Sequence, residues 1–407
     1  MKKYDLIVVG GGISGVAAAV SAAREGISVL LIEKTGSLGG AMSDSLVYPF
    51  MKFRMPESGK YLSDGIFTEM RERHKKFNDN SFETFKFVFD DMVTEAGVDV
   101  LFHACVFEAA TQDRRIRSLK VATKAGIMII EADFFVDASG DGELLFMTDC
   151  EFQLGREEDG LCQPMTTCFR VGDIDVNAFK QDRERIQQKY KEYQAAKKIT
   201  NPRENILVFF GLGEGTIHFN TTRVVRHNPV DPFELSKAEI IARRQIHEMI
   251  DFLKEISHAF DNCTLISIAN HIGVRESRKL KGVYVLTETD LANFVEFEDT
   301  IALGNYEIDI HNPSGTGTEI IKIPADKYYQ IPYRSLIPKE YDNMLVAGRC
   351  LSATHRAHSA VRIMPICACL GEAAGAAISI ANKTTKNIQN IDIKALRELL
   401  IKKGAAV

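Results

Sequence analysis

Three glycines, Gly10, Gly12 and Gly15, separate a six-residue apolar run at 4–9 from a segment of small apolar residues at 14–25. The apolar run is short, rich in β-forming residues and ends at glycine, which is typical of a buried parallel strand. Residues 14–25 follow a helical pattern, and the apolar residues 28–33 predict a second buried strand. Strand, helix and strand within about 30 residues form one βαβ unit, so the sequence predicts an α/β fold that opens with a Rossmann-like unit.

The glycine spacing also predicts a dinucleotide site at the turn between the first strand and the helix. Gly10 permits the tight turn, Gly12 lets the backbone approach a pyrophosphate, and Gly15 permits close packing of helix and strand. The helix N-terminus, with free N–H groups and the positive end of its dipole, favours the anion. Glu33 ends the second strand 18 residues after Gly15, where its carboxylate can accept hydrogen bonds from ribose hydroxyls. An acidic residue there disfavours a 2′-phosphate, and therefore NADP.

Composition narrows the class of protein and its partners. The chain has 407 residues, 45% of them apolar, which is enough for two or three soluble domains with sizeable cores. A net charge of −5 gives no reason to expect nucleic acid or an anionic membrane as a partner. Eight cysteines are scattered without a CxxC pair, which argues against zinc sites and a disulfide framework. Apart from the glycine-interrupted N-terminal run, we find no apolar segment near the roughly 18 residues of a membrane span. We therefore expect a cytoplasmic protein without a metal or a membrane span.

The remaining patterns predict a mixed set of strands and helices. A charged helix at 177–198 interleaves acidic and basic residues, which indicates a solvated face rather than a nucleic-acid patch. An amphipathic helix is expected at 236–257, opened by a capping box of Ser236 and Glu239. Further strands are expected at 98–109, 115–123, 127–137 and 343–347, and further helices at 66–76, 81–96, 363–382 and 391–403.

Three segments resemble the nucleotide-binding motifs of flavoproteins. Glu33-Lys34 followed by Leu38-Gly39-Gly40 is similar to the extended fingerprint, in which a second glycine pair lies near the cofactor phosphates. FFVDASGDG at 134–142 is similar to the second motif, and 342–377 is similar to the C-terminal motif, in which a helix points its N-terminus at the flavin pyrimidine. With these motifs in order, the chain resembles a family of bacterial FAD-dependent oxidoreductases related to glutathione-reductase-like and succinate-dehydrogenase-like flavoproteins.

This resemblance implies a Rossmann-like, glutathione-reductase-type FAD-binding domain with an inserted α+β substrate or cap domain. The FAD-binding domain would comprise 1–150 and 336–407, the latter including the C-terminal helix, and the cap would comprise 151–335. The bound FAD is expected to be noncovalent, because the glycine pair is not followed by the histidine that carries a covalent flavin. No CxxxxC follows the pair and no second GxGxxG exists, so neither a redox-active disulfide nor a separate NAD(P)H domain is expected. The implied cofactor contacts come from Gly10, Gly12, Ile13, Ser14, Gly15, Glu33, Lys34, Gly39, Gly40, Val106, Ala138, Ser139, Gly140, Gly348, Arg349, Ile363 and Met364.

Candidates for chemistry cluster before the last long helix. Flavin does the redox step itself, so the protein must supply position, charge and a proton-transfer group. Arg349, His355, Arg356, His358 and Arg362 form the densest polar group, and two histidines without a third ligand are weak support for a metal. The same side chains could instead bind FAD phosphates or cap the helix. We take His355, His311, Arg334 and Arg362 as the catalytic candidates.

Two further features have competing interpretations. Arg275, Glu276 and Arg278 could bind substrate or form an ion pair that supports the cap. His311 precedes a glycine-rich turn and could move a proton or be structural.

Three functions stay open at this point. The first is an FAD-dependent oxidoreductase that transfers a hydride between flavin N5 and a small polar or anionic substrate, with an unidentified electron acceptor or donor. The second is an NAD-binding, thiazole-synthase-like enzyme, which also opens with a glycine-rich strand, turn and helix. The third is a flavin-binding protein without turnover.

Overall fold

The central feature of the computed structural model, which describes residues 3–77, 81–384 and 386–407, is a seven-stranded sheet. Its parallel part has the order β3 (Asp99–Leu101), β2 (Val29–Ile32), β1 (Tyr4–Val9), β6 (Gly126–Asp137) and β17 (Met344–Val346). Side chains alternate between two hydrophobic clusters along these strands: Leu6 and Val8 belong to one cluster, Ile7 and Val9 to the other. Burial on both faces explains why the strands are continuous apolar runs.

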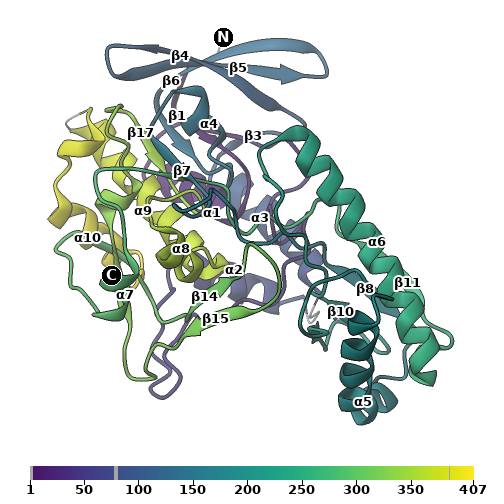
Figure 1. The fold of residues 1–407 in the computed structure, drawn as a ribbon. Coiled ribbons are helices and arrows are strands. Elements are labelled where there is room, and N and C mark those ends of the chain that lie inside the picture. Colours follow the sequence, from purple (N-terminus) through teal and green to yellow (C-terminus); the bar gives the residue numbers. More distant parts are fainter. Residues whose placement is uncertain (1–2, 78–80, 385) are drawn as a thin grey trace.

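Strand β6 is long because its two halves pair differently. Its C-terminal half pairs in parallel with β1 and β17, whereas its N-terminal half pairs antiparallel with β5 (Arg115–Thr123), which pairs antiparallel with β4 (Cys105–Gln112). These three strands form the ribbon at the top of Figure 1. The predicted strand 98–109 is therefore two strands, β3 and β4, interrupted at 102–104.

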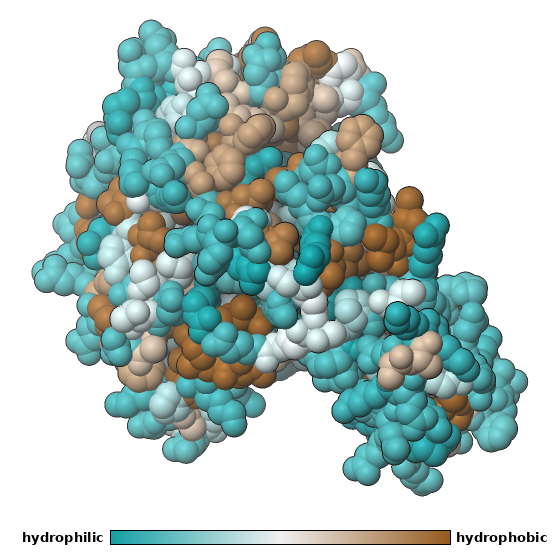
Figure 2. Space-filling model, in the orientation of Figure 1, coloured by the Kyte–Doolittle hydropathy of each residue, from teal (hydrophilic) through white to brown (hydrophobic). Residues whose placement is uncertain are grey.

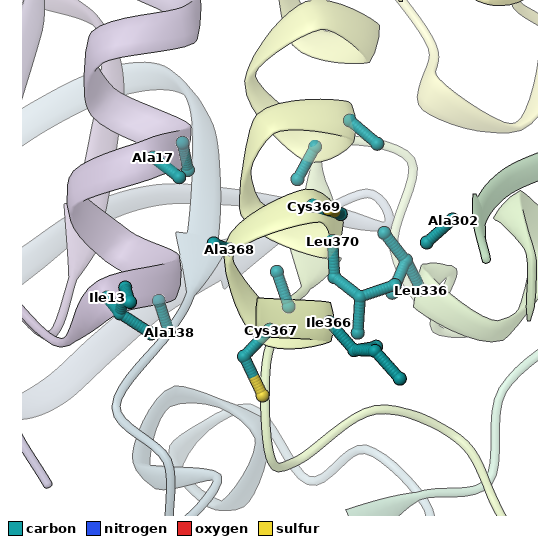
Figure 3. Packing of buried hydrophobic residues seen from close by; sticks show 14 of the residues in the cluster. Ile13, Ala17, Ala138, Ala302, Leu336, Ile366, Cys367, Ala368, Cys369 and Leu370 are labelled. Atoms are coloured by element: carbon teal, nitrogen blue, oxygen red, sulfur yellow. The ribbon is translucent and has the colours of Figure 1, made fainter. Parts of the chain in front are cut away.

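Two helices made of small residues pack closely on one face of the sheet. In α1 (Ile13–Ala23) and α9 (Met364–Lys383), a Cβ added to Gly371 would lie 2.0 Å from the Ser14 carbonyl oxygen, and one added to Gly375 would lie 2.2 Å from that of Ala18. Figure 3 shows Ala368 of α9 directed toward α1, with Ile366 and Leu370 directed toward Leu336 on the other side. Glycine is required at both positions because the two backbones touch.

Helix α9 corrects the expectation that the chain contains no second apolar segment of membrane-spanning length. The helix has 20 residues, and its most apolar stretch of 18 residues has a mean hydropathy of 1.6, so by length and composition alone it could cross a membrane. In the fold, 89% of that stretch is buried inside the protein. Its hydrophobicity is accounted for by its position between α1 and the strands that follow the inserted lobe, as is typical of a core helix.

The shorter helices complete the main body. Helices α2 (Ile66–Lys75) and α3 (Phe85–Glu95) pack near α1 and α9, and α10 (Ile393–Lys402) packs on α9. Helix α4 (Glu143–Met147) covers the opposite face of the sheet beside β4. Helix α8 (His355–Val361) lies against the β14–β15 hairpin described below.

A smaller lobe is built from residues 169–263 and the strand that follows them. Strands β11 (Thr264–Ile268), β8 (Phe169–Gly172), β10 (Ile217–Phe219) and β9 (Val208–Phe209) form a sheet in that order, covered by α5 (Val176–Ala195) and α6 (Pro232–Ile256). The lobe has its own hydrophobic cluster. It projects at the lower right of Figure 1, and Figure 2 shows its outer surface as mainly hydrophilic, as expected for the charged helix α5.

Other parts of the insertion share the core of the main body. Residues such as Leu286, Ile301, Tyr329 and Leu336 belong to the same hydrophobic cluster as α1 and α9. Leu286 precedes α7 (Glu288–Ala292). Ile301 and Tyr329 lie in the paired strands β13 (Thr300–Gly304) and β16 (Tyr329–Pro332), and Leu336 follows them. The remaining pairs are β14 (Ile308–His311) with β15 (Thr318–Ile321), and β7 (Phe152–Leu154) with β12 (Arg278–Leu280). The division of the chain at 150 and 335 stays a prediction.

One helix start differs from the predicted one. Helix α6 begins at Pro232, where the Asp231 side chain accepts hydrogen bonds from the Phe233 and Glu234 N–H groups at 3.0 and 2.8 Å. Ser236 lies inside the helix, and Glu239 accepts a hydrogen bond from the Ile272 N–H instead. An aspartate followed by proline is a strong start signal, and it takes precedence over the capping box expected at Ser236.

Candidate active site

The glycine-rich turn after β1 is shaped by close backbone contacts. Gly10 has a φ of +101°, and a Cβ there would lie 2.5 Å from the Ala138 carbonyl oxygen; one on Gly15 would lie 1.8 Å from that of Gly10. The second glycine pair lies beside the first motif, since the Gly39 N–H donates to the Gly11 carbonyl at 2.9 Å. By contrast, a Cβ added to Gly12 would have Gly40 Cα, at 4.0 Å, as its nearest neighbour. This open point at the start of α1 is where a pyrophosphate can approach the backbone.

Glu33 is held at the carboxyl end of β2. It is 5% exposed, and its carboxylate accepts hydrogen bonds from the Gly11 and Thr35 N–H groups at 2.6 and 2.8 Å. Because a carboxylate has about four acceptor positions, Glu33 keeps capacity for ribose hydroxyls. Nearby, the Ser14 hydroxyl is buried without a hydrogen-bond partner among the described residues. An orphaned buried hydroxyl at this helix start is what a site for an absent phosphate group leaves.

The second and third motifs meet around the end of β6. The Ala138 N–H donates to the Val9 carbonyl at 2.8 Å, and the Ser139 hydroxyl donates to Asp137 at 2.6 Å. Arg349, next to Gly348, pairs with Asp141 at 2.8 Å, beside Gly140. Burial would raise the pKa of Asp141, but the charges of Arg349 and Lys34 hold it below its usual value.

Two predicted cofactor residues have other partners in the structure. The Lys34 ammonium pairs with Glu143 at 2.7 Å. Val106 is buried on β4, in the hydrophobic cluster on the sheet face opposite α1. Their predicted contacts with the cofactor stay predictions.

The turn that follows β17 and leads toward α9 passes close to the start of α1. Gly348 has a φ of +89°, and a Cβ there would lie 3.0 Å from the Ser14 Cβ. Ile363 is the N-cap of α9 and offers no side-chain cap; Pro365 follows in the first turn. The free N–H groups near Ile363 and Met364 form the positive end of a 20-residue helix dipole. This placement fits the predicted role of stabilising negative charge on a reduced flavin ring.

His355 belongs to a buried group of three charged or titratable side chains. Its Nδ1 lies 2.9 Å from Glu276 Oε1, and Lys279 Nζ donates to the same carboxylate. Glu276 and Lys279 are fully buried. Burial would raise the pKa of Glu276, but the hydrogen bond from His355 and the charge of Lys279 lower it to about 2. Among the described residues Glu276 thus pairs with Lys279 and His355 and with neither Arg275 nor Arg278, so the interpretation of these residues as an Arg–Glu ion pair is wrong.

The same histidine borders an open cavity. The cavity has a volume of about 510 Å³, and its walls include His355, Thr354, Arg356, Glu288, Glu319 and Asn312. His358 does not face it: its Nε2 hydrogen-bonds the Arg349 carbonyl at 2.7 Å. Across 3–77, 81–384 and 386–407, no three histidine, cysteine or acidic side chains are grouped so as to hold a metal.

His311 lies in a different environment, on the β14–β15 hairpin. Ile310 lines the 510 Å³ cavity, and the adjacent His311 is directed to the opposite face of the strand. There its Nδ1 lies 2.9 Å from Arg223 Nη2, and its Nε2 lies 3.4 Å from Asp309. Because arginine only donates, Nδ1 is the acceptor and Nε2 carries the proton. Burial and the charge of Arg275 lower the pKa of His311 to about 3, so the ring is neutral.

Three further arginines, from separate segments, lie near the pair formed by Arg223 and His311. Burial is the largest cause that lowers the pKa of Arg275 to about 9. The next causes are the positive charges of Arg362, Arg203 and Arg223. Arg223 is 1% exposed and Arg203 is 5% exposed. These four residues, Arg203, Arg223, Arg275 and Arg362, are called the arginine cluster below.

The structure does not bring all four catalytic candidates together. Arg362 lies in the arginine cluster beside His311, and His355 lies at the cavity on the far side of the hairpin. Arg334 is engaged elsewhere: Asp299 binds its guanidinium at 3.0 and 3.1 Å, and its side chain is 46% exposed. Its predicted catalytic role has no support from this placement.

Arg203 and Arg223 were absent from the sequence-based candidates. Neither lies in a recognisable motif, and an arginine in the segments NPRE or TTRV has no local feature that separates it from a surface residue. Their burial depends on the fold of the smaller lobe.

Together, these features define a class of protein: a nucleotide-binding α/β protein whose dinucleotide cradle faces a return strand and a second helix N-terminus. A sequence model of the FAD-dependent oxidoreductase family matches residues 5–400, and the chain belongs to this family. It is an enzyme of that class and its cofactor is FAD. The closer kinship to glutathione-reductase-like or succinate-dehydrogenase-like proteins stays a prediction.

Individual relatives are more distant. A ferredoxin–NADP reductase of Mycoplasmoides gallisepticum is 36% identical over 78 residues, which is 19% of this chain and 23% of that protein. The chain therefore matches about a quarter of the length of that curated relative. Among solved structures, a geranylgeranyl bacteriochlorophyll reductase-like protein of Thermoplasma acidophilum has a TM-score of 0.49 at 13% identity, covering 100% of this chain and 85% of that one. The myxobacterial chondrochloren halogenase has a TM-score of 0.48 at 13% identity, covering 99% and 79%.

Proposed function

We propose that this enzyme transfers a hydride between a small anionic substrate and N5 of noncovalently bound FAD. The observation that carries the proposal is the arginine cluster, because Arg362 directly precedes Ile363, the N-cap of the helix predicted to face the flavin. A guanidinium fork matches a carboxylate, so the cluster would bind and orient an anion beside the flavin ring. FAD, when bound, supplies the hydride acceptor or donor.

Two histidines are suited to the accompanying proton transfer in different ways. His311 is neutral and directs its Nε2 proton at Asp309, so it could offer this N–H as a hydrogen bond to a substrate atom next to the arginine cluster. His355 donates its Nδ1 proton to the Glu276 carboxylate, which leaves Nε2 as the ring nitrogen available to a substrate at the cavity. We propose His311 or His355 as the proton-transfer residue.

The first experiment is a visible absorption spectrum of the purified protein before and after acid precipitation. Flavin colour released to the supernatant and identified chromatographically as FAD would support noncovalent binding. Colour kept in the pellet would contradict it. A colourless protein that takes up NAD but not FAD would favour the thiazole-synthase-like alternative, which family membership already disfavours.

The reaction is tested by anaerobic bleaching of the flavin with a panel of malate, succinate, lactate and amino acids. We expect bleaching with an anionic member. His311→Asn and His355→Asn should identify the proton-transfer residue by a slower single-turnover reduction of about 100-fold or more. Full rates in both variants and in the double variant would refute the assignment. Photoreduced protein that oxygen, quinone and ferricyanide all fail to reoxidise would favour a flavin-binding protein without turnover.

Other features of this proposal concern partners and location. We propose a small-molecule substrate, a separate electron acceptor or donor, and a cytoplasmic protein that binds neither nucleic acid nor membrane. The support is the mild net charge and the burial of α9. Fractionation of cells into cytosol and membrane, each probed for the protein, tests the location.

A further inference from the structure

The arginine cluster contains more positive charge than its surroundings neutralise. Arg223 lies 3.2 Å from Glu204, and this is the one ion pair to a carboxylate that the described part of the chain gives the cluster. Asp309 is the second acid whose charge reaches these residues, and it hydrogen-bonds Tyr306 at 2.9 Å. Arg203, Arg275 and Arg362 therefore form no ion pair with a carboxylate among the described residues. The neutral ring of His311 adds no charge of its own.

The uncompensated guanidiniums also have free donors. Arg275 uses Nη1 to bind the Pro164 carbonyl and the Thr166 hydroxyl, at 2.7 and 2.6 Å, and its other nitrogens have no hydrogen-bond partner among the described residues. Arg203 uses Nε alone, to Asn205 at 3.3 Å.

Arg362 is the most poorly satisfied member of the cluster. It reaches Gln163 at 3.5 Å, and its Nε is buried without a partner within 3–77, 81–384 and 386–407. The side-chain nitrogen of Gln163 is likewise buried and unpaired there. Together with the free donors of Arg203 and Arg275, these groups could donate several hydrogen bonds to a ligand that brings acceptor oxygens.

Such an arrangement is unfavourable without a ligand. A buried charge without a counter-charge is unfavourable, and like charges nearby make it more so. A partly exposed arginine such as Arg334, by contrast, is paired with the Asp299 carboxylate. The surplus inside the cluster therefore points to an anion that the protein is built to receive.

We propose that the arginine cluster binds a substrate with two carboxylate groups, which would bring negative charge and acceptor oxygens to these unpaired guanidiniums. Arg275 and Arg362 are held by the same segment, because Arg275 binds Pro164 and Thr166 and Arg362 reaches the adjacent Gln163. Arg203 comes from a different part of the chain. Guanidiniums that converge from separate segments suit two separated planar anions better than one compact tetrahedral anion. This inference rests on the proposed function only in taking the ligand to be the substrate.

Binding can be tested without turnover, by calorimetric titration of the FAD-loaded protein at neutral pH and low salt. The probes are malonate and succinate, with acetate as the monoanion and inorganic phosphate as the compact anion. We expect a saturable one-to-one site for a dicarboxylate, at least 10-fold tighter than for acetate or phosphate. Equal binding of acetate, preference for phosphate, or no binding of either dicarboxylate would overturn the proposal.

Variants connect the binding to these residues. Arg275→Gln and Arg203→Gln should each weaken dicarboxylate binding roughly 10- to 100-fold, as expected for loss of charge-assisted hydrogen bonds. Arg275→Lys, which keeps the charge, covers the case in which the glutamine variant fails to fold. The matched control is Arg115→Gln, a half-buried arginine on β5 that bonds the Lys386 and Asp133 carbonyls far from the cluster. Unchanged binding in both Arg203→Gln and the Arg275 variants would refute the site.

This test separates the site from the reaction. Tight, cluster-dependent binding of malonate with no flavin bleaching by any substrate in the panel would uphold the dicarboxylate site and count against the proposed hydride transfer. Bleaching by a monoanionic substrate, without dicarboxylate binding, would do the reverse.

Discussion

Glu372 of α9 is a buried acid whose pKa makes the stability of the protein depend on pH. It is 2% exposed, and its carboxylate accepts the N–H of Ile66, the first residue of α2, at 3.0 Å. Burial is the largest influence and raises the pKa of Glu372 to about 7 from 4.5, although the Ile66 hydrogen bond and Arg24 oppose it. The side chain also borders a cavity of about 330 Å³ between α1, α2 and α10.

The raised pKa fixes the sign of the effect. Between pH 4.5 and about 7, the folded state holds a proton that the unfolded state releases, so the free energy of unfolding falls as pH rises. Each unit of pKa difference corresponds to about 1.4 kcal/mol, so the full loss above pH 7 is about 3 kcal/mol. A glutamine at this position has no such dependence. The free energy of unfolding of Glu372→Gln minus that of the wild type should therefore increase by about 2 kcal/mol between pH 5 and pH 8, because only the wild type loses stability.

Urea denaturation of both proteins across that pH range measures this difference. Glu398→Gln, an exposed glutamate on α10, is the control and should follow the wild type. The slope against pH is decisive, because an unpaired amide in the variant would add a constant offset. A difference that stays flat, or that shrinks toward high pH, would refute the reasoning.

Three further substitutions test the fold. Gly15→Ala places a Cβ 1.8 Å from the Gly10 carbonyl oxygen, so the purified protein should contain little or no FAD; a full complement of FAD would contradict this. Gly375→Ala clashes with the Ala18 carbonyl, and we expect about 1–3 kcal/mol of destabilisation by thermal unfolding, whereas Gly315→Ala, with nothing within 4 Å, should be near neutral. Asn343→Ala removes three buried hydrogen bonds, to both backbone groups of Ile116 and to the Asp133 carbonyl; we expect roughly 1–3 kcal/mol less stability in urea, and an unchanged midpoint would be inconsistent with these bonds.

Local patterns predicted most of the cofactor-binding half of the fold. The strand at 4–9 has the same limits in the structure, and the helices expected at 177–198 and 363–382 are observed at 176–195 and 364–383. These elements were predictable because their apolar spacing and their end residues lie within a few positions of one another. The second glycine pair was predictable because it follows Glu33 by only a few residues. In the structure Gly39 contacts the first motif directly.

The substrate half depends on contacts between distant segments, which no local pattern encodes. Arg223 reaches His311, and Arg203 comes near Arg223, only after the smaller lobe has folded against the β14–β15 hairpin. Arg334, which sequence placed at a domain boundary, is instead turned outward because Asp299 binds it. An ion pair of Glu276 with a neighbouring arginine was one of two interpretations, but Lys279 and His355 bind its carboxylate instead. Lys279 lies three residues further on, and His355 belongs to a later helix.

The position of β17 and α9 in the fold bears on how the chain matures as it leaves the ribosome. The parallel sheet is completed by residues 344–346, and α1 gains its closest neighbour from 364–383. A nascent chain that has emerged only to residue 300 would therefore expose the small-residue face of α1 to solvent and to other chains. The lobe at 169–263, whose core is contiguous in sequence, can form at that stage. The smaller lobe is therefore expected to fold before the nucleotide-binding part of the chain that precedes it. The site for the nucleotide is then completed last.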